Sequence, residues 1–146
     1  MSFREAIRHE RMTALEDAAR QSAPPSLNKM VSNVDECFSE CLLRLIDEKG
    51  LKDPDVYKKA NIDRKLFSKI KNNRDYRPGK TTCIAFAIAM ELDFEETQAL
   101  IGKAGYALTH SSKFDIIVEY FIRNRIYDCF EINNALFRFG QPTIGG

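Results

Sequence analysis

Apolar residues recur every three or four positions along most of this chain, which is the spacing that places them on one face of an α-helix. The longest such stripe lies within residues 26–49 and consists of Leu27, Val31, Val34, Phe38, Cys41 and Leu45. Ser26 suits the N-cap and Gly50 suits the position after the last turn, so the pattern predicts one continuous helix. No stretch alternates with the period of two that marks a strand, and the predicted fold is therefore all-α.

This long helix has two interpretations. In the first, it buries one face in the core of a domain. In the second, its first half, Leu27 to Val34, pairs with a second subunit in a coiled-coil-like seam.

Four short helices are predicted in the middle of the chain, at about 53–59, 64–72, 81–91 and 94–102. The third is apolar on nearly every side, which is typical of a buried helix at the centre of a domain. The fourth begins after Asp93, with Glu96 three residues later, and this is the spacing of a capping box.

Two further helices are predicted in the tail, one after Ser112 and one after Asp128, and together they form a helical hairpin. The hairpin carries apolar residues outside its main apolar faces, namely Ile116, Tyr120, Phe130 and Phe137. Two helices cannot hide this much apolar surface against each other. We therefore expect the hairpin to pack on the body of the protein or on a second subunit.

The domain organisation follows from these elements. Residues 1–25 form an N-terminal arm and linker, because a weak amphipathic helical pattern over residues 2–20 ends at Pro24 and Pro25. Residues 26–109 form a central helical domain with a long first helix, and residues 110–146 form the C-terminal helical hairpin.

The composition is that of an ordinary globular protein. Of 146 residues, 44% are hydrophobic and 29% are charged, with a formal net charge of +1. No apolar run approaches the roughly 20 residues needed to cross a bilayer. The N-terminal residues mix charges of both signs and lack the apolar segment of a secretory signal. We therefore expect a cytoplasmic protein without a membrane partner.

The four cysteines occupy helical positions that suit small apolar side chains, at Cys37, Cys41, Cys83 and Cys129. Two of them, Cys37 and Cys41, lie one helical turn apart and could contribute two thiolates to a metal site. However, the chain has only two histidines, His9 and His110, and no second closely spaced cysteine pair to complete a tetrahedral set. We expect reduced core thiols, no metal and no cofactor.

A catalytic set is not evident either. His9 lies in the arm, and His110 precedes a helix cap, where a polar residue is unremarkable. The acidic residues at 91–96 lie at helix ends, where capping accounts for them, and there is no Gly-rich phosphate loop. We therefore do not expect an enzyme.

Charge is concentrated in one short segment. Residues 58–80 contain nine Lys/Arg and two acids, Asp63 and Asp75, a local net charge of +7, whereas the whole chain carries +1. A basic helix behind a sharp turn, in an otherwise acidic protein, is typical of a surface that binds a phosphate backbone.

The helix predicted at 64–72 has two faces. Its apolar residues, Leu66, Phe67 and Ile70, point to the core, while the opposite face is polar. Side chains that can bond base edges in a major groove lie in its first turns, at Arg64, Lys65, Ser68 and Lys69. Candidate phosphate contacts lie at its end and in the following loop, at Lys71, Asn72, Arg74, Arg77 and Lys80. The expected partner is double-stranded DNA.

Residues 38–103 resemble the helix-turn-helix domain of the lambda-repressor/Cro type. The resemblance lies in the Lys49-Gly50 pair that ends the first helix, two short helices around a turn, a Pro-containing loop, the segment IAFAIAMEL and the Leu100-Ile101 pair. It implies a lambda-repressor-like helix bundle that regulates transcription by placing helix 64–72 in the major groove. It places base contacts at 64, 65, 68 and 69 and backbone contacts at 72, 74, 77 and 80.

Two residues depart from that family's pattern. Asn61 stands where a Gly is usual at the turn, a mild change because Asn tolerates a left-handed backbone. Tyr57 stands where a small Ala is usual, and its ring is expected to push the two short helices apart or to rotate them.

Residues from about 35 to 143 also resemble a helical module of Gram-positive bacteria that occurs alone or attached to macro-domain proteins, which bind ADP-ribose. This resemblance implies that the module can assist another activity. The alternative function is therefore a protein-interaction module that regulates a partner protein or enzyme through the hairpin, in which Phe130 and Phe137 matter and the cations around Arg64 do not. A homodimer is also expected, because one headpiece covers only a single half-site.

Overall fold

The computed structural model describes residues 2, 5, 26–32 and 34–145, and in these residues the protein is all-α. Its helices, with no strand among the described residues, are α2 (Leu27–Ser32), α3 (Phe38–Glu48), α4 (Asp53–Lys59), α5 (Arg64–Asn72), α6 (Lys80–Ala89), α7 (Phe94–Gly102), α8 (Lys113–Arg123) and α9 (Cys129–Arg138). The predicted all-α class is confirmed. The helical pattern predicted for the arm falls almost entirely outside the described residues.

The stretch predicted as one helix over 26–49 consists of two helices, and that prediction was wrong. α2 ends at Ser32, residues 34–37 are not helical, and α3 begins at Phe38. Asp35 lies between the two helices, and an Asp side chain competes with the hydrogen bonds of a helix interior. A new helix start follows at once, because the backbone N–H of Cys37 donates to the Glu40 carboxylate at 3.2 Å.

The chain divides between Asp35 and Glu36 into two units, of which the first contains α2. The apolar side chains of α2 and the residues after it are exposed, at Leu27, Met30, Val31 and Val34. The first half of the predicted stripe therefore does not continue the buried face of α3, whose own apolar residues Phe38, Cys41 and Leu45 lie in the core.

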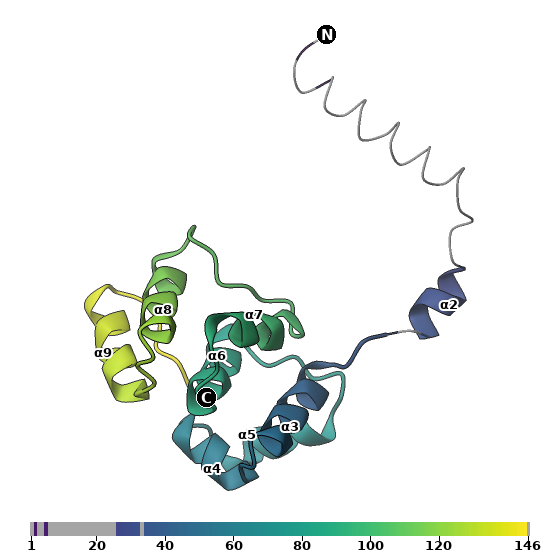
Figure 1. The fold of residues 1–146 in the computed structure, drawn as a ribbon, viewed down its shortest axis with the longest axis horizontal. Coiled ribbons are helices and arrows are strands. Elements are labelled where there is room, and N and C mark those ends of the chain that lie inside the picture. The colour runs from purple at the N-terminus through teal and green to yellow at the C-terminus, as the bar shows by residue number, and fades with distance from the viewer. Residues whose placement is uncertain (1, 3–4, 6–25, 33, 146) are drawn as a thin grey trace. The chain divides into compact units, whose positions relative to one another are not determined.

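Within the unit 36–146, α6 is the central helix, as predicted, and its residues from Thr82 to Ala89 are all buried. It packs against α4, α7 and α9, and Figure 1 shows it between the helices α3–α5 and the pair α8–α9. The Phe86 ring lies 6.2 Å from that of Phe38 and 6.0 Å from that of Phe67. This aromatic contact joins α3, α5 and α6 into one core.

Short-range signals account for the ends of these helices. Asp93 accepts a hydrogen bond from the backbone N–H of Glu96, and the Glu96 carboxylate bonds back, which confirms the predicted capping box. Ser112 and Asp128 also cap α8 and α9, each by accepting from a backbone N–H in the first turn, without the reciprocal bond. Gly50 follows α3 with φ +66°, as expected for the residue after the last turn.

The hairpin is part of the body. α8 packs on α7 and α9 packs on α6, and the two helices pack on each other. After α9 the chain turns back, so that Ile144 is buried and both its backbone N–H and its C=O bond the side-chain amide of Asn133. The Thr82 hydroxyl donates to the Gly145 carbonyl at 3.0 Å, which attaches this segment to the start of α6.

Among the residues that the structure describes, no helix is both long enough and apolar enough to cross a membrane.

Candidate nucleic-acid interface

The turn between α4 and α5 holds the two helices in a defined geometry. Asn61 adopts φ +59°, its N–H donates to the Lys58 carbonyl, and the N–H of Ile62 donates to the Tyr57 carbonyl at 2.8 Å. This is a Schellman motif with Asn in the left-handed position, so the predicted tolerance of Asn61 is confirmed. Ile62 is buried, and the Asp63 carboxylate then caps α5 by accepting from the N–H of Leu66 at 2.7 Å.

The two predicted faces of α5 are present. Phe67 and Ile70 are buried, Leu66 is half-buried, and the cations at 64, 65, 69 and 71 are exposed together with Asn72. Ser68 is half-buried. The side chains predicted to contact bases therefore lie on one accessible side of the helix, with Ser68 the least accessible of them.

Tyr57 is accommodated between the two helices. Its ring is half-buried and lies 5.2 Å from the Phe67 ring, at an interplanar angle of 38°. α4 and α5 are in contact with each other, and a wider spacing than in the lambda-repressor arrangement stays a prediction. A rotation of the two helices relative to the lambda-repressor arrangement stays a prediction.

A groove of about 450 Å³ lies between α4 and α5 and is lined by Asp53, Pro54, Tyr57, Arg64, Phe67, Ser68 and Lys71. The lining includes two aromatic rings and three charged side chains. Lys71 Nζ reaches the Asp53 carboxylate at 3.0 Å, while Arg64 adds a cation at the start of α5. The groove is therefore positive near Arg64 and partly neutralised where Lys71 meets Asp53.

Arg64 and Lys65 have no ion-pair, hydrogen-bond or aromatic partner for their side chains among the described residues. Both stand in the first turn of α5 and are exposed. Lys69, by contrast, places its ammonium 4.5 Å from the centre of the Tyr76 ring in the following loop. The start of α5 thus carries two cations that no described side chain holds in an ion pair or a hydrogen bond.

The loop cations have partners inside the protein. Arg74 forms an ion pair with Glu40 on α3. Arg77 donates to the Ala104 carbonyl at 2.6 Å, and its guanidinium lies 4.5 Å from the centre of the Tyr106 ring. These contacts tie the loop between α5 and α6 to α3 and to the end of α7.

Lys80 has the most buried partner. Its ammonium lies 2.7 Å from the carboxylate of Asp115, which is only 2% exposed. The backbone N–H and hydroxyl of Thr109 also bond Asp115. Sequence reasoning missed this acid, which stands in the first turn of α8 and looks like an ordinary helix-start residue. The only signal for its role is its apolar setting between Phe114 and Ile116.

These pairs fall into two energetic classes. The Arg74–Glu40 pair is exposed on both sides, and the Lys71–Asp53 pair joins an exposed lysine to a half-buried carboxylate. Pairs as open to water as these contribute only about 0–1 kcal/mol. A phosphate oxygen could replace either carboxylate at little cost. The Lys80–Asp115 pair is different, because removing Lys80 leaves the buried carboxylate of Asp115 without compensation. Lys80 is therefore bound mainly within the fold, although a phosphate contact by it stays a prediction.

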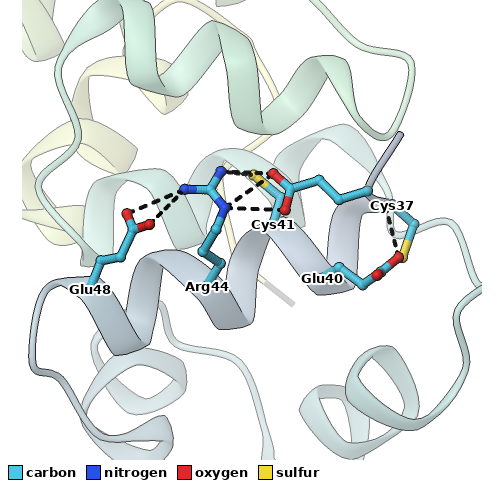
Figure 2. Close-up of polar contacts among 6 residues, drawn as sticks. Cys37, Glu40, Cys41, Arg44 and Glu48 are labelled. Atoms are coloured by element: carbon cyan, nitrogen blue, oxygen red, sulfur yellow. Dashed lines mark hydrogen bonds and ion pairs between the residues drawn. The ribbon is translucent and has the colours of Figure 1, made fainter. Parts of the chain in front are cut away.

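We call the exposed cations of α5 together with Arg74 the basic surface. It ends at an acidic network on and just before α3. Figure 2 shows Arg44 lying along α3 beside Glu48, and its guanidinium also bonds Glu36 at 2.7 Å. The hydrogen bond from Arg44 holds the pKa of Glu36 below its usual range. Glu40, on the other side of the helix start, bonds the N–H of Cys37 and pairs with Arg74. Arg44 is therefore occupied by carboxylates, and α3 presents net negative charge next to the loop.

All four cysteines are free thiols, but only two are buried, Cys41 and Cys83; Cys37 and Cys129 are half-buried. Burial raises the pKa of the Cys83 thiol to about 12 and also raises that of Cys41, so these two are unreactive near neutral pH. Within the described part of the chain, no group of His, Cys, Asp and Glu is arranged to hold a metal ion.

No family model, no curated protein and no solved structure matches this chain.

Proposed function

We propose that this protein binds double-stranded DNA and regulates transcription by inserting α5 into the major groove. The observation that carries the proposal is the pair Arg64 and Lys65, exposed at the start of a capped helix and without partners among the described residues. Unpaired cations at this position are available to guanine acceptors and phosphates without first breaking an internal contact. The tight turn before α5 and the aromatic contact beneath it hold the helix in place.

The proposed DNA contacts differ in which contacts within the protein must be broken to make them. Arg64, Lys65, Ser68 and Lys69 contact base edges, with Lys69 leaving Tyr76 to do so. Lys71, Asn72 and Arg74 contact phosphates, the two cations by exchanging a weakly bound carboxylate for a phosphate oxygen. Arg77 and Lys80 contribute long-range attraction from their present positions, because their direct partners belong to the fold.

The test is a salt titration of binding to mixed-sequence and genomic DNA fragments, followed by substitution of Arg64. The wild-type protein is expected to show a steep salt dependence and to retain some fragments at about 0.15 M salt. On a retained fragment, Arg64→Ala is expected to weaken binding by about 1–3 kcal/mol and to relax sequence preference. Lys113→Ala is the matched control, because it removes one exposed cation on α8, a helix that does not belong to the basic surface. Equal binding by the Arg64 and Lys113 variants would overturn the assignment of α5.

The same fragments separate base contacts from phosphate contacts. Arg74→Ala is expected to weaken binding to all sequences alike and to reduce the salt slope by about 1. A loss confined to one fragment would instead assign Arg74 to base recognition.

Regulation as a homodimer in the cytoplasm of a bacterium is part of the proposal. One copy of α5 covers a single half-site, and two copies give the specificity that a regulator needs.

A second candidate function is supported by a specific observation. Phe130 and Phe137 are 75% and 78% exposed on α9, and this is unusual for aromatic residues without a partner. In this alternative, the hairpin binds another protein, and the basic surface is an ordinary solvent-exposed face without a ligand. A protein that binds no DNA at low salt, and whose Phe137→Ser variant loses a protein partner, would establish this alternative.

A further inference from the structure

Each helix of the hairpin exposes apolar side chains on the side opposite its own buried residues. On α8 the buried residues Phe114, Val118 and Phe121 lie on one side, and Ile116 and Tyr120 lie on the opposite side, 47% and 59% exposed. On α9 the buried residues are Ile132 and Leu136, and Phe130 and Phe137 lie opposite them. The spacings of four and seven residues keep each exposed pair on one helical face. We call Ile116, Tyr120, Phe130 and Phe137 the hairpin patch.

The size of the hairpin patch suits a protein interface. Since an aromatic side chain presents about 150–250 Å², the exposed fractions of Phe130 and Phe137 alone, 75% and 78%, correspond to roughly 300 Å² of apolar area on α9. Monomeric proteins rarely leave a larger apolar patch uncovered. A standard interface buries about 800 Å² on each partner, so the hairpin patch has the area of an interface centre that needs only a polar rim.

Beside its exposed phenylalanines, α9 carries polar side chains that can form the rim of such an interface. Their order along the helix lets two copies of α9 pair opposite charges. Glu131 and Arg138 lie on the same flank, seven residues or about two turns apart, and both are exposed. Neither side chain has an ion-pair or hydrogen-bond partner among the described residues. Asn134 lies between them on the outward face, and its amide can both donate and accept.

We infer that the hairpin patch binds a second copy of this chain, with α9 antiparallel to α9 of the second copy. A two-fold axis near Asn134 then places Glu131 of each copy opposite Arg138 of the other and brings Phe130 against Phe137. A parallel arrangement would place like charges together. A two-fold contact of this kind is isologous and closes after two copies. The other exposed apolar stripe, on α2, has Lys29 as its only charged residue and offers no opposite charge for such a pairing.

The first test is the oligomeric state of the full chain without DNA, measured by sedimentation equilibrium. The wild-type protein is expected to dimerise at micromolar concentrations. Phe137→Ser is expected to weaken dimerisation at least tenfold, because it removes an aromatic anchor from the interface centre. Its melting temperature at high dilution should match that of the wild type, since Phe137 is exposed in the monomer. A wild type that stays monomeric at about 100 μM would overturn the inference, even if the patch bound another protein.

The second test exchanges the rim charges. Glu131→Arg alone and Arg138→Glu alone are each expected to weaken dimerisation about tenfold, because each places two like-charge pairs across the two-fold axis. The double variant is expected to recover most of that loss. Both reversals oppose the helix dipole of α9, so a recovery cannot come from a more stable helix. A double variant weaker than both single variants would exclude the antiparallel arrangement.

This inference rests on the hairpin alone and does not require that the protein bind DNA. Because the oligomeric state is measured without DNA, a failure of this inference removes the homodimer from the proposed function but leaves the DNA contacts of α5 untouched. A dimeric protein that ignores DNA would likewise leave the interface in place.

Discussion

The basic surface around α5 and the hairpin patch on α8–α9 expose opposite kinds of side chain. α5 buries Phe67 and Ile70 and exposes its cations, whereas α9 buries Ile132 and Leu136 and still exposes two phenylalanines. The first surface suits a charged partner whose attraction falls with salt. The second suits an apolar partner that excludes water. A small helical domain can therefore carry two independent binding surfaces, provided that each helix keeps one face for the core.

The cations near α5 do not all belong to the basic surface. The largest expected effect on stability distinguishes a cation bound within the fold from one that is available to a ligand. Lys80→Met removes the cation that offsets the buried carboxylate of Asp115 and is expected to lower the free energy of unfolding by about 3 kcal/mol. Lys71→Met removes the partner of the half-buried Asp53 and is expected to cost less than about 1 kcal/mol. Urea unfolding of both variants provides the measurement. Similar small losses for both would show that Lys80 is as available to a ligand as Lys71.

The turns that support the two surfaces give the next comparison. Arg125 follows α8 with φ +55°, and Asn61 follows α4 with φ +59°. A long side chain is strained in this left-handed conformation, whereas Asn tolerates it. Arg125→Gly is therefore expected to raise the free energy of unfolding by roughly 0.5–1 kcal/mol, and Asn61→Gly is expected to change it by less. Thermal unfolding would check both, and a larger gain at Asn61 would show that the α4–α5 turn is the more strained of the two.

The smallest expected effect is a change in how the stability depends on pH, and it concerns Arg123 and Glu119 on α8. Arg123 donates to Glu119 at 2.9 Å, and this hydrogen bond holds the pKa of Glu119 below its usual range, with help from His110. A carboxyl group with a lowered pKa stabilises the folded state above its unfolded pKa, about 4.3, and that contribution is lost as the pH falls through the folded value.

Arg123→Ala is therefore expected to make the loss of stability between about pH 5 and pH 3 shallower than in the wild type. Arg123 also stacks on Phe94, at 4.2 Å from the ring centre, so the variant loses some stability at every pH. Urea midpoints of the wild type and of the variant are measured at pH 7 and at pH 3.5. The packing loss is the same at both pH values, so the difference between them reports the titration of Glu119. An unchanged pH profile would mean that Glu119 gains nothing from Arg123.

The helices and their faces could be predicted from the sequence where local chemistry decides them. α4, α5 and α7 have the predicted bounds, because a cap, a proline or a turn residue stands at each end. α6 begins and ends slightly earlier than the predicted 81–91, since Glu91 already lies in the left-handed region. The break after α2 was not predicted, because apolar spacing continues through residues 34–37 although the backbone does not.

The candidate site could be predicted only in part. Arg64 and Lys65 are exposed, as the helical period indicates. The partners of Arg77 and Lys80 lie 27 and 35 residues further along the chain, and no local pattern relates them. The same limit applies to Tyr57, whose ring finds room because Phe67 lies beside it.

The sequence by itself determined the all-α class, the capped helix starts, the central place of α6 and the charge concentrated around α5. These properties depend on residues within a few positions of one another, where backbone hydrogen bonding and side-chain period act directly. Only the tertiary structure decided which cations are bound by acids and which remain free, and which apolar residues stay exposed. Those outcomes depend on which helices meet, because burial and ion pairing are properties of neighbours in space.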